Sequence, residues 1–211
     1  MIKGVLFDLD GVLWLSRKGH EAGYLESLKE YKVNQSNLLE ANYFGRATSD
    51  VIAEVLSAKN ISFDHILLEN LVNKKRSISN DFLKEVRPVN MEIIKDFDLL
   101  KQKGLKIGIV TSSSRQNLEL FLTSLTQKVI FDVLVSIEEV SNPKPAPDVY
   151  LLAIKKLNSH PSDLIAVEDT NLGKSAANNA GVKCYLYRSE FDCENKFRWP
   201  NILKEILINS E

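Results

Sequence analysis

The sequence has little cysteine, with only Cys184 and Cys193 among its 211 residues. Their spacing is unlike that of metal-binding cysteine motifs, which argues against a zinc–cysteine site. Cys184 lies in an apolar run and is expected to be a thiol of the core. The small number of cysteines and their spacing therefore predict a reduced, intracellular protein.

The sequence also lacks a long apolar run and an excess of charge of either sign. No run approaches the roughly 18 apolar residues of a membrane-spanning helix, and the first run is too short for a secretory signal and has no cleavage site. The net charge is −1 and the isoelectric point is about 6.3. We therefore predict a cytoplasmic protein with no nucleic-acid and no membrane partner.

The first apolar run of the chain, residues 2–7, ends in two carboxylates. Such a run predicts a buried strand of a parallel sheet. Asp8 and Asp10 follow two residues apart, so the period of a strand places them on one side, and Gly11 permits a sharp turn. Ligands of open α/β sheets bind at the carboxyl ends of strands. Two carboxylates crowded there need a cation or a proton, unless one only caps a helix and the other is solvated.

The pattern then changes from strand to helix across residues 15–85. Apolar residues recur at helical spacing around 24–31, 51–56 and 67–82, and no stretch alternates as a strand would. This predicts a small helical bundle inserted after the first strand. Within it, the basic cluster Lys74, Lys75 and Arg76 is expected to form a solvated face, with contact to a ligand as the alternative.

From residue 88 onward, strands and helices alternate again. Ile93, Ile94, Phe97 and Leu100 fit one amphipathic helix that stops at Gly104. Strands are expected over 106–110, within 131–136, over 164–167 and over 183–186, with helices between them. The predicted fold class is α/β, a Rossmann-like parallel sheet core with helices on both faces, plus a small inserted all-α domain. The core takes residues 1–14 and 86–211, and the insert takes residues 15–85.

Polar residues also follow other strands of the predicted sheet. Thr111 and Ser112 come after the strand 106–110, where hydroxyls and backbone N–H groups can hold a phosphate or merely cap the next helix. Lys144 lies between two prolines in a loop. Its ammonium is therefore held in place and can neutralise a phosphate or a carboxylate, with a solvated loop lysine as the alternative.

A second acidic pair, Glu168 and Asp169, follows the strand 164–167. With Asp8, Asp169 offers two carboxylates to one hard cation such as Mg²⁺, which keeps water and a substrate phosphate as further ligands. A nucleophilic carboxylate, a neighbouring acid, a fixed lysine and an acidic metal pair together predict phosphoryl transfer through an aspartyl-phosphate.

Four segments of this chain occur in the order typical of one family. They are Phe7-Asp8-Leu9-Asp10-Gly11-Val12-Leu13, Val110-Thr111-Ser112, Lys144-Pro145-Ala146-Pro147 and Val167-Glu168-Asp169-Thr170. The chain resembles the haloacid dehalogenase (HAD) superfamily, specifically its phosphatases and phosphomutases with a small helical cap after the first motif. Residues 173–181 also resemble this family, so the resemblance covers the whole chain.

The resemblance implies roles for the matching residues. Asp8 is expected to be the nucleophile and a Mg²⁺ ligand. Asp10 is expected to be the general acid/base, with its backbone carbonyl on the metal. Thr111 and Lys144 would hold the transferring phosphoryl group, and Ser112 would add a contact through its backbone N–H.

The resemblance extends to the metal site and to the cap. It implies that Asp169 is a metal ligand and that Glu168 lies in or next to the metal shell. His20 resembles a residue near the hinge, with an exposed histidine on a helix as the alternative. Gly45 and Arg46 resemble the cap loop that selects the substrate, where an arginine can bind a distal anionic group or remain a surface charge.

The chain departs from the family pattern at both junctions of the insert. It has Trp14-Leu15-Ser16 where an acid and a Ser or Thr are usual, which leaves the substrate class open, and Pro88-Val89 where Pro-Gly is usual. The predicted function is a Mg²⁺-dependent phosphatase of a small phosphorylated metabolite, such as a sugar phosphate, acting as a monomer or weak dimer. The alternatives are a sugar phosphomutase of the β-phosphoglucomutase type and a catalytically silent binding relative.

Overall fold

The computed structural model describes residues 1–126, 128–188 and 198–210. The chain separates into two compact units, one formed by Met1–Leu15 and Val89–Glu211 and the other by Ser16–Pro88. We call them the core unit and the cap unit. None of the helices in the described ranges is both long and apolar enough to cross a membrane.

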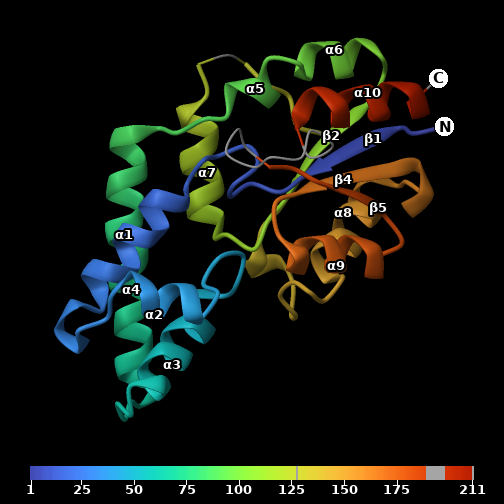
Figure 1. Ribbon diagram of the computed structural model, residues 1–211. Coiled ribbons are helices and arrows are strands. Elements are labelled where there is room, and N and C mark those ends of the chain that lie inside the picture. Colours follow the sequence, from blue (N-terminus) through green and yellow to red (C-terminus); the bar gives the residue numbers. More distant parts are fainter. Residues whose placement is uncertain (127, 189–197, 211) are drawn as a thin grey trace. The chain divides into compact units, whose positions relative to one another are not determined.

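The helices and strands follow one another in the order seen in Figure 1. They are β1 (Gly4–Phe7), α1 (Arg17–Ser27), η1 (Lys29–Tyr31), α2 (Gln35–Glu40), α3 (Thr48–Ala58), α4 (His65–Val86), α5 (Met91–Ile94), α6 (Phe97–Gln102), β2 (Lys106–Val110), α7 (Arg115–Ser124), β3 (Val133–Val135), η2 (Ile137–Glu139), α8 (Asp148–Leu157), η3 (Pro161–Asp163), β4 (Leu164–Glu168), α9 (Asn171–Asn179), β5 (Lys183–Leu186) and α10 (Trp199–Ser210).

The core unit is built on a five-stranded sheet with the order β3-β2-β1-β4-β5, in which every pairing is parallel. β1 is the central strand and is buried along its length, as the apolar run predicts. Phe7, its last residue, lies opposite Ile109 of β2 and Val167 of β4. Because the three strands end almost level, the polar residues that follow them share one edge of the sheet. The predicted α/β fold with a parallel sheet is confirmed.

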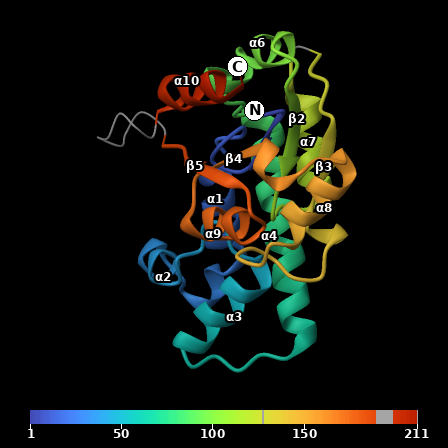
Figure 2. The same ribbon diagram turned by 90° about the vertical axis from the view of Figure 1, so that its right-hand side faces the viewer.

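Helices cover both faces of this sheet, and successive residues of β1 point to opposite layers. Leu6 packs in a hydrophobic cluster with residues of α8 and α9. Phe7 faces the other way, with its ring 5.1 Å from that of Phe97 in α6 and 5.8 Å from that of Trp199 in α10. Figure 2 shows α6 and α10 on one side of the sheet and α8 and α9 on the other.

The cap unit is entirely helical within the described residues, and its longest element is α4. Helix α1 packs along α4, and their apolar side chains join those of α2 and α3 in one cluster. The predicted solvated face is right for Lys74 and Arg76, which are exposed, and wrong for Lys75, which is only 4% exposed. The Lys75 ammonium lies 4.6 Å from the centre of the Tyr24 ring, because α1 covers that face of α4.

Two further expectations about the core concern the helix before β2 and the thiol of Cys184. The single helix expected over Ile93–Leu100 is two short helices, α5 and α6. Asp96, between them, accepts a hydrogen bond from Trp199 Nε1 at 2.8 Å, a tertiary contact that hydrophobic periodicity does not report. Cys184 is partly buried against the core cluster, consistent with a core thiol, and Cys193 lies outside the described residues.

Candidate active site

A buried lysine connects the ends of three strands in the core unit. The Lys144 ammonium donates to Asp8 Oδ1 at 2.7 Å, to Glu168 Oε1 at 2.6 Å and to the Val110 carbonyl at 3.0 Å. Asp8 follows β1, Val110 ends β2 and Glu168 ends β4. All three protons of the ammonium are therefore satisfied, and the prolines on both sides of Lys144 restrict the loop that carries it.

The burial of these charges shifts their pKa values. Burial raises the pKa of Asp8 well above its usual range, Lys144 opposes this effect, and the carboxylates of Glu168 and Asp169 add to it. Burial alone would lower the pKa of Lys144, but Asp8 and Glu168 outweigh it and hold that pKa above its usual range. The lysine is therefore charged, and its ammonium is paired with two acidic side chains, Asp8 and Glu168.

Glu168 is enclosed by Tyr150 of α8 and Gly173 of α9. Tyr150 of α8 donates its hydroxyl to Glu168 Oε1 at 2.5 Å, and burial followed by the charge of Glu168 raises the pKa of Tyr150, which keeps the phenol protonated. Glu168 Oε2 lies against Gly173 of α9, where a Cβ atom would be 1.9 Å away. Glycine is thus required at this position by close approach.

We predict that Gly173→Ala lowers stability by at least about 2 kcal/mol, because the new methyl group has to displace a buried carboxylate. The expected fall in the thermal midpoint is about 4–8 °C for a chain of this size. Thermal unfolding measures it. Ser175→Ala, at an exposed position of the same helix, should stay within about 0.5 kcal/mol of the wild type. Equal midpoints for the two variants would contradict the close approach.

Three buried acids at this edge of the sheet have the chemistry of a cation site. Asp8, Glu168 and Asp169 each offer an oxygen within 4.8 Å of the others. Glu168 Oε1 is already shared by Lys144 and Tyr150, so Asp8 and Asp169 are the better ligands. A set of hard carboxylate oxygens with surplus negative charge fits Mg²⁺ better than a soft metal.

The turn after Asp8 places Asp10 beside the loop that follows β2. Gly11 has a φ of 84°, in the left-handed region that glycine adopts without strain. Asp10 Oδ2 accepts a hydrogen bond from Ser113 Oγ, and Asn117 Nδ2 donates to the same Ser113 oxygen at 3.3 Å. The loop after β2 thereby orients the Asp10 carboxylate, whose charge also contributes to raising the pKa of Asp8.

The hydroxyls after β2 divide into two roles. Ser114 caps α7, since its side chain accepts from Asn117 N. Thr111 is 1% exposed and its Oγ1 accepts from Ser113 N at 2.9 Å, which leaves its own proton for another acceptor. Ser112 Oγ is buried and has no hydrogen-bond partner among the described residues. Thr111 and Ser112 are therefore suited to contact a ligand.

Two of the three residues expected in the cap contact other cap residues, and the third lies in a turn. Lys75 Nζ lies 2.9 Å from His20 Nδ1. Arg46 donates to the Ala41 carbonyl at 2.5 Å and pairs with Glu54 at 2.8 Å. Gly45 has a φ of 76°, as a turn residue would. Their expected contact with a substrate stays a prediction.

Several residues of the site escaped the sequence reasoning. Ser113 adjoins Thr111 and Ser112, but nothing in the loop reveals which hydroxyl meets Asp10. Tyr150 is six positions after Lys144, and the helix start at Pro147 is the only local signal that it turns back toward the site.

The family model of the haloacid dehalogenase-like hydrolases matches residues 5–187. Among curated proteins, the validoxylamine A 7'-phosphate phosphatase of Streptomyces hygroscopicus subsp. limoneus is 29% identical over 96% of this chain and 99% of its own. The pyrophosphatase PpaX of Bacillus cereus is 28% identical over 86% of this chain and 81% of its own.

Among solved structures, a β-phosphoglucomutase from Clostridium difficile superimposes with a TM-score of 0.83. The alignment covers 99% of each chain at 20% identity. At that identity the likeness concerns the fold, which is shared along the whole length.

Proposed function

The chain belongs to the haloacid dehalogenase-like hydrolases, and from that membership we propose that it is a Mg²⁺-dependent phosphatase. Its substrate would be a small phosphorylated metabolite, such as a sugar phosphate. The observation that carries the proposal is the Lys144 ammonium, 2.7 Å from Asp8 and 2.6 Å from Glu168 within one buried cluster. Such a cluster suits the attack of a carboxylate on a phosphoryl group.

In the first step of the proposed reaction, Asp8 attacks the phosphorus atom. A bond forms between a carboxylate oxygen of Asp8 and phosphorus while the bond to the leaving oxygen breaks. Lys144 neutralises negative charge on the transferring group, and the Thr111 hydroxyl with the Ser112 backbone N–H donates hydrogen bonds to its oxygens.

Asp10 is proposed to move protons in both steps. As an acid it protonates the leaving oxygen, and as a base it then takes a proton from the water that attacks the aspartyl-phosphate on Asp8. The hydrogen bond from Ser113 orients its carboxylate for this task. The products are the dephosphorylated alcohol and inorganic phosphate, with Asp8 regenerated.

Asp8, Asp169 and the backbone carbonyl of Asp10 are the proposed Mg²⁺ ligands, with Glu168 next to them as the partner of Lys144. When bound, the cation supplies positive charge that favours ionised Asp8 and offsets the charge of the substrate phosphate. In the cap, His20, Gly45 and Arg46 are proposed to contact the rest of the substrate. We further propose a cytoplasmic monomer or weak dimer.

Phosphate release is the test of this proposal. We expect hydrolysis of an aryl phosphate in the presence of Mg²⁺, its loss in excess chelator and its recovery when Mg²⁺ is added back. Release that persists unchanged in chelator would refute the metal requirement. A mutase, the alternative, would instead convert one sugar phosphate into its isomer and release little phosphate, and a screen of phosphorylated sugars separates the two.

Binding of Mg²⁺ should also be visible without a substrate. A ligand at about 100 times its dissociation constant stabilises the folded state by about 2.7 kcal/mol, so the thermal midpoint should rise by about 5–10 °C. Asp169→Asn should reduce this rise, because it removes one proposed ligand. Asp163→Asn, whose carboxylate pairs with Lys3 at the other end of β4, should respond as the wild type does. If Mg²⁺ raised the thermal midpoint equally in all three proteins, Asp169 would not be a ligand.

A further inference from the structure

A buried asparagine lies behind the Asp10 turn with its side chain fully hydrogen-bonded. Asn90 is 4% exposed. Its Nδ2 donates to the Val12 carbonyl at 2.7 Å and to the Tyr187 hydroxyl at 3.0 Å, and its Oδ1 accepts from Glu92 N at 3.2 Å. Its backbone N–H donates to the Leu13 carbonyl at 2.8 Å. Asn90 thus holds two consecutive carbonyls of the turn.

Tyr187 connects this asparagine to the end of β4. The Tyr187 hydroxyl accepts from Asn90 and donates to Glu92 Oε2 at 2.9 Å. Its backbone N–H donates to the Glu168 carbonyl at 2.7 Å. Arg188, the next residue, donates to the Asp169 carbonyl. The segment after β5 therefore holds the backbone of both acids that follow the core of β4.

We propose that Asn90 and Tyr187 form a strut, defined as these two residues and their hydrogen bonds, that positions the Asp10 turn relative to the Glu168–Asp169 end of β4. Neither residue contacts the carboxylates of the site in the bonds described, so both are positioning residues. The inference rests on the proposed function, because it assigns them to the step in which Asp10 transfers a proton.

The strut adds to the bonds made within the turn and to the bond from Ser113 to Asp10. Gly11 N donates to the Trp14 carbonyl at 2.7 Å, and the amides of Val12, Leu13 and Trp14 all donate to the Leu9 carbonyl. These bonds shape the turn but do not fix it against β4. A buried, fully paired amide and phenol supply that constraint, and proton transfer is sensitive to displacements of about 1 Å.

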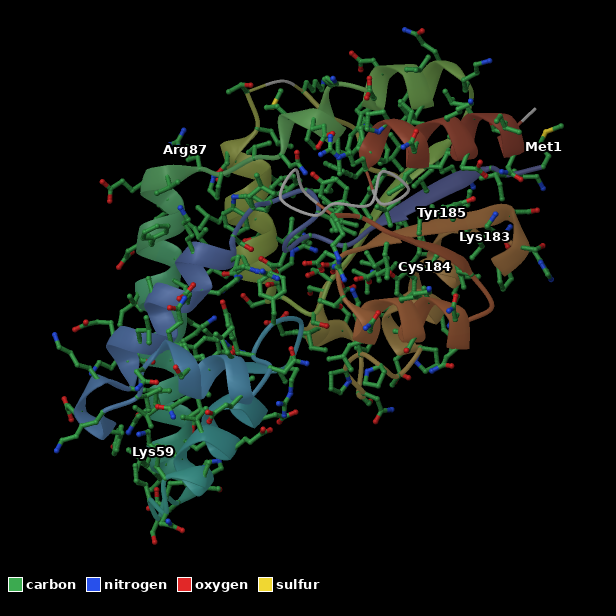
Figure 3. The ribbon with its side chains drawn as sticks, viewed as in Figure 1. Met1, Lys59, Arg87, Lys183, Cys184 and Tyr185 are labelled. Carbon is green, nitrogen blue, oxygen red and sulfur yellow. The ribbon has the colours of Figure 1, made fainter. Side chains whose placement is uncertain are left out.

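The kinetic test compares two substrates in three variants. Tyr187→Phe removes one hydroxyl, and Asn90→Ala removes the bond to Val12. Both should lower kcat more for an alkyl phosphate, whose leaving group needs a proton, than for an aryl phosphate. For Asn90→Ala we expect kcat to fall about tenfold with the alkyl phosphate and less than about threefold with the aryl phosphate. For Tyr187→Phe the difference between the two substrates should be smaller. Tyr185→Phe is the matched control, since this tyrosine of β5 (Figure 3) donates its hydroxyl to Glu205 instead, and its kcat should be unchanged.

Hydrogen–deuterium exchange tests the strut without any substrate. Amides of residues 11–14 should exchange faster in Asn90→Ala and Tyr187→Phe than in the wild type, whereas Tyr185→Phe should leave them unchanged. Equal losses of kcat on the two substrates, or unchanged exchange of the turn in both strut variants, would overturn the inference. If the wild type released no phosphate from either substrate, the proposed function would be refuted, and the exchange result would still decide whether the strut holds the turn.

Discussion

Asp8→Asn is expected to abolish turnover while the protein stays folded. The amide has the shape of the carboxylate but is a poor nucleophile, so no aspartyl-phosphate can form. It also removes one charged ligand from the proposed Mg²⁺ site. The same substitution leaves Lys144 paired with Glu168 at 2.6 Å and bound to the Val110 carbonyl, so the buried ammonium keeps charged and polar partners.

The covalent intermediate can be measured directly. Wild-type protein quenched in acid during turnover of a labelled substrate should carry a phosphoryl group that hydroxylamine releases, and Asp8→Asn should carry none. Asp163→Asn, just before β4 begins and so at the far end of that strand from the site, serves as the control and should label as the wild type does. Turnover near the wild-type rate in Asp8→Asn would exclude the covalent mechanism.

The change in stability caused by Asp8→Asn can be predicted as well. Burial raises the pKa of Asp8 in the folded state above its unfolded value, so ionisation of Asp8 costs stability once the pH exceeds its unfolded pKa of about 4. Without Mg²⁺ at pH 7, the variant should therefore unfold at a temperature no lower than the wild type. The difference should shrink as the pH falls through about 4, below which Asp8 is protonated in both states.

Asp10→Asn is expected to lower kcat by about 10²–10⁴-fold for a sugar phosphate, which is the usual contribution of general acid–base catalysis. The alkoxide of a sugar needs a proton as it leaves, and an amide cannot donate one effectively. The backbone carbonyl of residue 10 is unchanged, so Mg²⁺ and the substrate should still bind.

Separating the two half-reactions tests the assignment of Asp10. With an aryl phosphate, formation of the phosphoenzyme should be affected less, because its leaving group is stable as an anion. Its hydrolysis should be slowed for both substrates, since water needs the same base. Rapid quenching measures each step. If the first step lost the same factor with both substrates, Asp10 would not be the acid, and its role would be limited to the turn or the metal.

The sheet and the positions of its polar strand ends could be predicted because their signals are local. The apolar run before Asp8 and the carboxylates after it are adjacent in sequence, and a parallel sheet brings such ends to one edge. The sequence did not show which hydroxyl of the loop after β2 contacts Asp10 and which caps the next helix. Ser113 meets Asp10 and Ser114 caps α7, and both outcomes depend on the path of the loop.

Contacts between distant segments account for the other differences. Lys75 belongs to a basic cluster in sequence, but α1 covers it and its ammonium lies over the Tyr24 ring. Asn90 and Tyr187 are separated by most of the core sequence, and nothing near either residue indicates that they meet. Such pairings are set by tertiary packing, to which periodicity and motif spacing are insensitive.

The junction of the insert has a consequence for how this protein can change. Trp14 pairs with Val89 as an isolated bridge, and Asn90 N–H bonds the Leu13 carbonyl, so the chain leaves and re-enters the core at neighbouring points. Closing a loop between fixed, adjacent ends costs an entropy that grows only slowly with loop length. The core can therefore carry inserts of very different size at this point without altering a strand, and substrate range can evolve by exchange of the insert while the chemistry at the sheet edge is retained.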